Sequence, residues 1–313
     1  MDPDEIFGAA KRRALTPEEA GTLLACFPMF WWDHVLALLG TGLRFGEFAG
    51  LRRRRVHLDR AVPVLQVVDV RYQAGRYGSG FKNRPKSDAG FREIPLAPLV
   101  VEAIRRQLPP DATTDTLVFT GPGGANGVLR GTRTVLSRDS FHRTFEGAVA
   151  KLTDPAATLR PTATRVLRAL RAAGAGTVPE LVGRLATAGR ALAPASVDAA
   201  LGELEAAGLA VSNRQAPCWS PVVDPRPTGF EHLALRGAHD FRHTFATWLE
   251  DAGIPARVID ELMGHEHSQR ARHTGGSKIG RRYRETTPEM LGRVVAAVEE
   301  RLELVLEVAE EQR

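Results

Sequence analysis

The spacing of apolar side chains predicts a mainly helical protein. Between residues 288 and 311, apolar residues recur every three or four positions, which is the pattern of one long amphipathic helix. Shorter periodic stretches elsewhere begin near Thr or Pro and end near Gly, residues that commonly start and stop helices. The expected helices are 17–26, 30–39, 47–51, 98–107, 139–152, 161–173, 178–188, 194–207, 239–251, 255–263 and 288–311.

Two β-rich stretches interrupt this helical pattern. Residues 62–70 and 92–95 flank a basic, glycine-containing segment, so they predict a hairpin or the edge of a small sheet. Residues 117–120 predict one more short strand, followed by a glycine-rich loop at 121–127. The expected fold class is mainly α with a small antiparallel β-sheet.

The composition changes between residues 154 and 225, where Ala and Leu dominate and Pro stands at both edges. This stretch predicts three short helices, followed by extended pieces at 209–211 and 218–222 that are separated by a polar turn. Three helices closed by a hairpin are typical of a winged helix-turn-helix. The alternative is a small helical subdomain. In either case we expect an insert within a larger domain.

The charge is distributed unevenly, although the formal net charge is only +5. From residue 41 to 92 there are twelve Lys or Arg against four Asp or Glu, and from 264 to 284 there are six against one. Basic blocks that are separate in sequence can converge into one electropositive face, as binding to a phosphate backbone requires. The alternative is scattered, solvated charge.

The two cysteines, Cys26 and Cys218, exclude a disulfide framework and favour a reducing, cytoplasmic location. The acidic start of the chain lacks the apolar region of a signal peptide. No apolar run approaches the roughly 18 residues of a membrane-spanning helix. We therefore expect no membrane association.

The first candidate for chemistry is Arg44, in the segment TGLRFGE at 41–47. Its neighbours Gly42 and Gly46 allow another backbone to approach closely. An arginine between two apolar elements is seldom buried without a partner, and Glu47 could orient it. The alternative is a helix-cap arginine that only pairs with Glu47.

Two histidines and a second arginine lie in neighbouring helical segments. His239 and Arg242 are three residues apart and share one helix face, while Phe241, Phe245 and Trp248 share another, apolar face. The alternative is a solvated polar face. His265 follows Gly264, which ends the next helix, so its ring can face a cleft. A zinc site of His265, His267 and His273 would lack a Cys or paired carboxylate, and we expect no metal.

Tyr283 is one of only three tyrosines, and it is surrounded by Arg281, Arg282 and Arg284. A phenol has a pKa near about 10, so a tyrosine nucleophile needs electropositive surroundings such as these. The alternative is a surface tyrosine that stacks on arginine.

In this order, the segments resemble the catalytic domain of the tyrosine recombinase, or phage integrase, family. The segments 41–47, 239–253 and 262–267 are similar to its first-arginine, His-x-x-Arg and Leu-Gly-His motifs. RRYRETTPEML at 281–291 resembles the nucleophile segment, especially that of actinobacterial integrases. The stretch 84–96 resembles the hairpin that carries the family's lysine, which falls on Lys86, and LVFTGPGG at 117–124 is also similar. The resemblance covers about residues 12–153 and 230–293.

The resemblance implies a site-specific recombinase that needs no cofactor. Tyr283 would attack the scissile phosphate and form a 3′-phosphotyrosyl intermediate. Arg44 and Arg242 would bind the non-bridging oxygens, and His265 would hydrogen-bond the phosphate. Lys86 would be the general acid, with Lys82 as the alternative, and His239 would help to deprotonate Tyr283. Glu47 would support Arg44.

The implied partner is double-stranded DNA, bound by a homotetramer. The residues expected to contact DNA are Arg52, Arg53, Arg54, Lys82, Arg84, Arg281, Arg282 and Arg284. The expected domains are 12–153 and 226–293 for the two catalytic parts, 154–225 for the insert and 294–313 for a C-terminal helix. That helix would dock onto a neighbouring protomer or pack within its own chain.

Two features depart from the family pattern. Only about 15 residues precede the first expected helix, where family members carry a helical core-binding domain, so we expect weak DNA binding. The third helix of the insert carries Asp198, Glu203 and Glu205 but no Lys or Arg, which favours protein contact over base readout. The alternative functions are a non-catalytic DNA-binding regulator, a decayed mobile-element integrase, and a resolvase or topoisomerase-like nicking enzyme.

Overall fold

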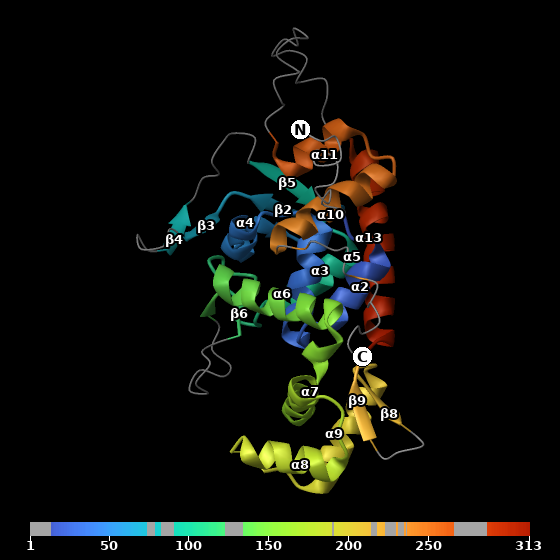
Figure 1. Ribbon diagram of the computed structural model, residues 1–313. Coiled ribbons are helices and arrows are strands. Elements are labelled where there is room, and N and C mark those ends of the chain that lie inside the picture. Colours follow the sequence, from blue (N-terminus) through green and yellow to red (C-terminus); the bar gives the residue numbers. More distant parts are fainter. Residues whose placement is uncertain are drawn as a thin grey trace, which may run out of the picture. The chain divides into compact units, whose positions relative to one another are not determined.

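The computed structural model forms two compact units, and Figure 1 shows their elements. Unit 1 comprises Met1–Glu146 and Ala234–Arg313, and unit 2 comprises Gly147–Leu233. The chain therefore leaves unit 1 and returns to it after an insert somewhat longer than 154–225. The residues that the structure describes are 14–73, 79–82, 91–122, 134–189, 191–213, 218–222, 230, 235, 237–265 and 287–313.

Unit 1 is mainly helical, as the apolar spacing predicts. Thr16 starts its first helix because its hydroxyl accepts a hydrogen bond from the Glu19 amide, while the Glu19 carboxylate accepts one from the Thr16 amide. No helix in the described ranges has the length and apolar composition that crossing a membrane requires. The helices are α2 (Pro17–Ala25), α3 (Trp32–Thr41), α4 (Phe45–Gly50), α5 (Pro98–Gln107), α10 (Ala238–Asp251), α11 (Ala256–Met263), α13 (Pro288–Glu311) and α6 (Arg138–Thr153), whose residues from Gly147 onward belong to unit 2.

Helix α3 continues past Gly40, where the sequence pattern predicted its end. Gly40 lies inside the helix, where an added Cβ would be 2.4 Å from Cγ2 of Val100. This glycine therefore serves close packing of α3 on α5. The helix ends at Gly42, whose φ of 59° is the left-handed conformation that commonly caps helices.

Among the described residues, unit 1 also contains three small antiparallel sheets. The first sheet contains β1 (Val56–His57), β2 (Val64–Val67) and β5 (Arg92–Pro95), in that order. The second pairs β3 (Val70–Gln73) with β4 (Ser79–Lys82), so the expected strand 62–70 is divided between two sheets. The third pairs β6 (Thr120–Gly121) with β7 (Thr134–Val135).

Strand β3 lies directly against α4, which explains the glycines of that helix. A Cβ on Gly46 would be 2.6 Å from the Arg71 carbonyl oxygen, and one on Gly50 would be 2.8 Å from the Arg71 nitrogen. The predicted close approach at Gly46 is therefore confirmed. It sets the β3–β4 hairpin beside the segment that carries Arg44.

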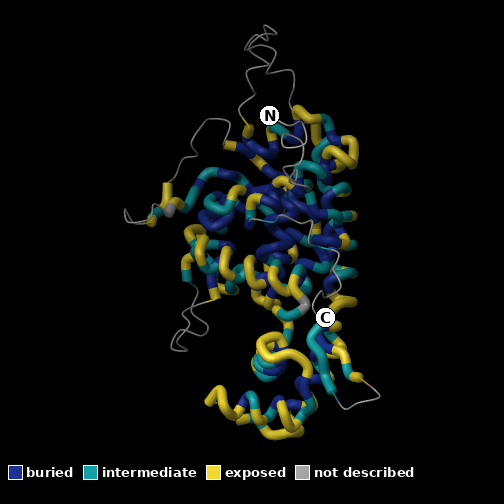
Figure 2. Tube along the Cα trace, in the orientation of Figure 1, coloured by how far each residue is buried: buried dark blue, intermediate teal, exposed yellow. Residues whose placement is uncertain are grey.

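The C-terminal helix α13 packs within its own unit. Figure 2 colours the chain by burial, and the buried residues of α13 include Val294, Val298, Leu302 and Val305. Helices α2, α10, α3 and α5 pack against α13. The approach is close at Gly21, where a Cβ would lie 2.7 Å from the Val305 carbonyl oxygen. Packing within the same chain, one of the two expected arrangements of this helix, thus covers its apolar face.

Unit 2 has the three helices and the hairpin expected for a winged helix-turn-helix. Its elements are α7 (Pro161–Ala173), α8 (Val178–Thr187), α9 (Pro194–Ala206), β8 (Ala210–Asn213) and β9 (Cys218–Pro221). Leu170, Leu181 and Leu201 belong to its own buried core, against which Trp219 packs. A further β-bridge joins Gly176 to Trp219 and ties the hairpin to the turn before α8.

Candidate functional site

Glu47 lies at the centre of a buried network at the start of α4. Its carboxylate accepts hydrogen bonds from the Arg44 amide at 2.9 Å and from Arg44 Nη1 at 3.0 Å. The Arg92 guanidinium donates to the same carboxylate, from Nη1 at 3.2 Å and from Nη2 at 2.9 Å. Burial raises the pKa of Glu47, but the hydrogen bond and charge of Arg92, followed by those of Arg44, hold the net pKa below its usual value. The carboxylate is therefore ionised, and it holds both the amide and the guanidinium of Arg44.

Arg242 extends from α10 into the interior. Its Nη1 donates to the Gly42 carbonyl at 2.6 Å, and its Nη2 donates to the Met263 carbonyl. Only 2% of Arg242 is exposed, so this residue does not belong to a solvated polar face. Burial lowers its pKa to about 9, with the charge of Arg44 as the next cause, so the guanidinium is charged at neutral pH.

His265 follows α11 and contacts Arg242. The distance between Arg242 Nη2 and His265 Nε2 is 3.4 Å, and His265 Nδ1 lies 3.3 Å from Asp260 Oδ1. Arginine can only donate, so Nε2 accepts and Nδ1 carries the proton that it shares with Asp260. About half of the imidazole is exposed. His265 therefore lies between a buried cation and solvent.

His239 and the aromatic residues of α10 occupy different faces of that helix, as predicted. His239 is exposed, whereas Phe241, Phe245 and Trp248 are buried. His239 is one turn before Arg242, at the start of α10. The helix thus packs its apolar face inward and presents the His239 imidazole to solvent.

Three of the arginines expected to contact DNA, Arg52, Arg53 and Arg54, have intramolecular partners. Arg54 pairs with both Asp69 and Asp115, and Asp69 is buried. Arg52 donates to the Asp115 carbonyl at 2.6 Å, and Arg53 donates to the Val56 carbonyl at 2.9 Å. These contacts hold the turn after α4 in place, and they neutralise part of its charge.

Lys82 lies on β4, where it pairs with Val70 across the hairpin. Its Nζ is 5.0 Å from the centre of the Tyr72 ring, a cation–π contact on an exposed surface. Arg52 stacks in a similar way over Phe81, at 4.9 Å. Other predicted residues fall outside the described ranges, namely Arg84, Lys86, Arg281, Arg282, Tyr283 and Arg284.

The metal hypothesis also falls partly outside the described ranges. His267 and His273 are not described. Within the described ranges, no group of three or more His, Cys, Asp or Glu is placed to hold a metal ion.

Arg92 is the site residue that the sequence interpretation did not single out. It opens strand β5 and is only 8% exposed. Besides binding Glu47, its Nε donates to the Leu262 carbonyl at 2.6 Å. A signal was available, because strand alternation places Arg92 on the same inward face as Ile94. A charged residue at a buried strand position requires a partner.

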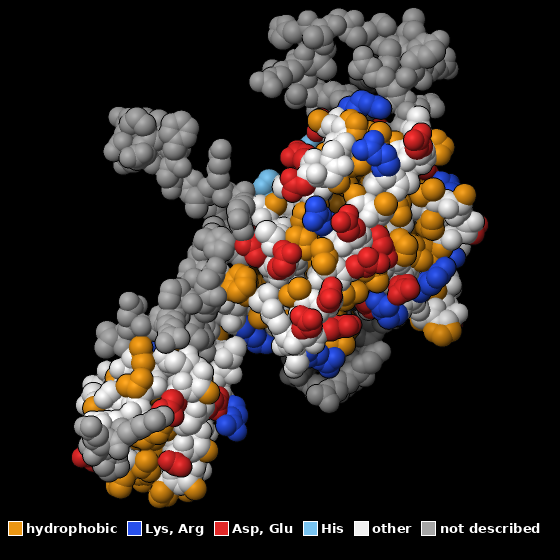
Figure 3. Space-filling view, turned by 90° about the vertical axis from the view of Figure 1, so that its right-hand side faces the viewer, with side chains coloured by type: hydrophobic (Ala, Val, Ile, Leu, Met, Phe, Trp, Pro, Cys, Tyr) orange, Lys and Arg blue, Asp and Glu red, His pale blue; other side chains and the backbone are white. Residues whose placement is uncertain are grey.

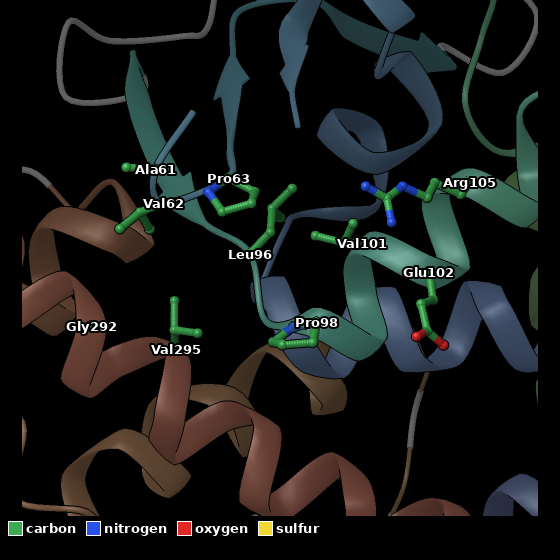
Figure 4. A pocket seen from close by; sticks show the side chains of 10 residues that line it. All are labelled: Ala61, Val62, Pro63, Leu96, Pro98, Val101, Glu102, Arg105, Gly292 and Val295. Carbon is green, nitrogen blue, oxygen red and sulfur yellow. The ribbon is translucent and has the colours of Figure 1, made fainter. Parts of the chain in front are cut away.

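A separate apolar cavity of about 310 Å³ lies elsewhere in unit 1 (Figure 4). Side chains from the turn at Pro63, from α5 and from the first turns of α13 line it, among them Val62, Val101 and Val295. None of the described site residues contributes to its lining. The cavity is therefore distinct from the arginine network.

The surface of unit 1 in Figure 3 carries charged side chains of both signs, interspersed with apolar ones. This face is not uniformly basic. The arginine network itself offers positive charge to a phosphate. There Arg44, with 44% of its side chain exposed, and the half-exposed His265 border the buried Arg242. Planar guanidinium groups and an imidazole in this arrangement suit the oxygens of a phosphate.

Comparisons with known proteins identify related segments. Residues 231–273 match the phage integrase family. A putative prophage phiRv2 integrase from Mycobacterium tuberculosis is 34% identical over 114 residues, in each of two strains. This match covers 34% of the present chain and 29% of the relative, so it spans less than a third of that protein.

Two solved structures of the Tn1549 transposon integrase are also similar. One is a complex with a circular intermediate DNA, at 16% identity and a TM-score of 0.45. The other is a complex with transposon right end DNA, at 17% identity and a TM-score of 0.46. In both cases the match covers 87% of the present chain and 65% of the other.

Proposed function

We propose that the chain is a tyrosine recombinase of the phage integrase type, which cleaves and rejoins DNA strands site-specifically through a 3′-phosphotyrosyl intermediate; the match of residues 231–273 to that family and the prophage integrase relative support this proposal. The observation that supports this function is the meeting of Arg44, Arg242 and His265 at the last turn of α11. These residues come from three segments that are far apart in the sequence. Together they form a compact electropositive site for one phosphodiester.

In the proposed reaction, the Tyr283 oxygen attacks the scissile phosphorus, and the bond from phosphorus to the 5′ oxygen breaks. Arg44 and Arg242 stabilise the charge that develops on the non-bridging oxygens, and His265 donates a hydrogen bond to one of them. To donate from Nε2, His265 must first gain a proton on that nitrogen, by a change of tautomer or by protonation, and must release the hydrogen bond that Nε2 accepts from Arg242. His239 takes the tyrosine proton, and Lys86 protonates the leaving 5′ oxygen.

Lys82 remains the alternative general acid. It is four residues before Lys86, and it lies on the described strand β4 with its Nζ over Tyr72. In that role it would have to leave the aromatic ring. Comparison of Lys82→Ala with Lys86→Ala, using a substrate whose 5′ leaving oxygen is replaced by sulfur, identifies the acid. Sulfur needs little protonation, so it rescues only the variant that lacks the acid.

The proposed partner is double-stranded DNA, bound by a homotetramer that joins two duplexes in the cytoplasm. In this proposal, residues 12–153 and 226–293 form the catalytic domain, residues 154–225 form the insert, and residues 294–313 form the terminal helix. Exposed arginine and lysine side chains would supply phosphate contacts, and the affinity would then fall steeply with salt. Analytical ultracentrifugation with and without synaptic DNA tests the tetramer.

For the insert we propose a protein partner rather than base readout. Asp198 and Glu205 of α9 are exposed, whereas Glu203 is bound by Arg160. An acidic helix repels the DNA backbone, so a basic protein surface suits it better. If reversing the charges of Asp198 and Glu205 abolished DNA binding without affecting protein contacts, this role would be wrong.

The test of the proposed function is capture of the covalent intermediate. The DNA site is unknown, so the protein is incubated with a pool of nicked duplexes of random sequence. Complexes that survive detergent are then isolated and sequenced. We expect adducts with the wild type, and we expect protease digestion to leave DNA on the peptide that contains Tyr283.

The matched control is Tyr72→Phe, which removes a phenol from an exposed strand of the same unit. Tyr283→Phe should abolish the adducts, and Tyr72→Phe should leave them. The proposal fails if the wild type forms no adduct, or if the Tyr283→Phe protein forms as many.

A further inference from the structure

Three arginines bind three consecutive carbonyl groups at the end of α11. Arg92 Nε donates to Leu262 at 2.6 Å, Arg242 Nη2 donates to Met263, and Arg44 Nη2 lies 3.4 Å from the Gly264 oxygen. The last carbonyls of a helix lack partners within the helix and carry partial negative charge. Cationic donors therefore stabilise this turn. Because the three arginines bind neighbouring carbonyls of this turn, the turn also fixes the positions of their guanidinium groups relative to one another.

Arg92 differs from the other two arginines because it is enclosed. Its Nη1 and Nη2 bind the two oxygens of Glu47, its Nε binds Leu262, and only 3% of its side chain is exposed. Such a guanidinium has no free face for a phosphate. Arg92 can affect the reaction through Glu47 and through the backbone of α11.

The position of Arg92 in the chain connects two functional segments. It opens β5, six residues after Lys86, and it is held in the sheet opposite Val67. Its acceptor Leu262 is three residues before His265, after which the chain runs on to Tyr283. One side chain thus bridges the fixed ends of the segments that carry the proposed acid and the proposed nucleophile.

We propose that Arg92 is a positioning residue that holds these two chain ends in register with Arg44. The inference rests on the proposed function for the roles of Lys86 and Tyr283. The bridge itself does not depend on those roles. Loss of the bridge slows the chemical step without removing a group that touches the phosphate, because small misplacements reduce rates strongly.

A lysine cannot replace Arg92 in this role. The guanidinium offers donors in three directions from one rigid plane, and it uses them for two carboxylate oxygens and one carbonyl. A lysine supplies charge to Glu47 from a single nitrogen. Arg92→Lys therefore keeps a positive charge beside Glu47 but removes the simultaneous hydrogen bonds to the Glu47 carboxylate and to the Leu262 carbonyl.

The first measurement is hydrogen exchange of the full-length protein without DNA. Arg92→Lys should raise the exchange of the last turn of α11 and of β5 together, by about fivefold or more, with other regions unchanged. The control is Arg106→Met, which removes an arginine that donates to Asp33 from Nε and Nη2 outside the site. It should change neither region.

The second measurement is the single-turnover rate of covalent adduct formation. Arg92→Lys should lower this rate at saturating DNA by about tenfold or more, with the Kd for DNA within about twofold of the wild-type value. The proposal would be overturned if Arg92→Lys showed the same hydrogen exchange and the same adduct rate as the wild type. It would also be overturned if the variant only bound DNA more weakly, or if its hydrogen exchange rose equally in all regions. If the wild type forms no adduct, the proposed function fails, while hydrogen exchange still decides whether the bridge exists.

Discussion

Arg242 Nη1 donates a hydrogen bond to the carbonyl oxygen of Gly42, and the donor and acceptor are 2.6 Å apart across 200 residues of sequence. Gly42 caps α3 two residues before Arg44, and Arg242 lies in the second turn of α10. The first arginine segment is therefore fixed to the helix that carries the second arginine. This contact sets the distance between the two cations that the proposed site requires.

Replacing Gly42 should loosen this connection. Its φ is 59°, and an added Cβ would lie 2.4 Å from Cδ1 of Phe245 on α10. We expect Gly42→Ala to reduce the free energy of unfolding by about 2–5 kcal/mol, through backbone strain and overpacking combined. Urea denaturation measures this change. Gly253→Ala is the control, since Gly253 has a φ of 69° but nothing within 4 Å, and it should cost about 1–2 kcal/mol. Equal losses would mean that contact with Phe245 has no effect.

Local signals predicted the elements of this fold better than they predicted the contacts of the site. Thr16 and Pro17 mark the start of α2 because a capping box involves only neighbouring residues. Gly40 was misread as a helix end because its reason is distant, namely packing against Val100. Pattern alone does not identify Leu262 as the acceptor of Arg92, because the acceptor is a backbone carbonyl 170 residues away.

The predicted DNA contacts illustrate the same limit. Arg52 and Arg54 stand in a basic run, and their charge suggested phosphate binding. The fold brings Asp69 and Asp115 to them from other segments, which a count of local charge does not show. Residue types and order therefore identified Arg44, Glu47, Arg242 and His265. Tertiary structure was needed to show what holds them.

Acid should weaken the Glu47 network. Folding lowers the pKa of the Glu47 carboxyl below its unfolded pKa of about 4.3. The ionised carboxylate therefore contributes its full share of the folding stability above that unfolded pKa, and this share is lost as the pH falls through the folded pKa. Glu47→Gln should therefore destabilise the protein at pH 7 by about 3 kcal/mol, and the difference from the wild type should shrink as the pH falls below about 4. Denaturation at a series of pH values measures this.

Glu93→Gln provides the control on the same strand as Arg92. Glu93 pairs with Arg60, but both side chains are more than 40% exposed, so its loss should cost less than about 1 kcal/mol. A difference between Glu47→Gln and the wild type that stayed constant down to low pH would contradict the proposed linkage.

Asp260 should act through His265 rather than on the phosphate. Its Oδ1 is 3.3 Å from His265 Nδ1, so it fixes the imidazole with Nε2 toward Arg242. We expect His265→Ala to slow adduct formation by about 100-fold and Asp260→Ala by about tenfold, with the double variant equal to His265→Ala alone. Glu261→Ala, at the next position of α11, is the control. Additive effects of the two substitutions would mean that Asp260 acts independently of the imidazole.

The two units should unfold as separate transitions, because each has its own core. Leu201 is completely buried in the core of unit 2, and Leu36 is 1% exposed in unit 1. Replacing either leucine with alanine removes comparable buried volume and should cost about 2–5 kcal/mol in its own unit. In scanning calorimetry, Leu201→Ala should lower the midpoint of one transition and Leu36→Ala that of the other. A single transition that shifts equally in both variants would show that the insert and the arginine-bearing unit unfold as one cooperative structure.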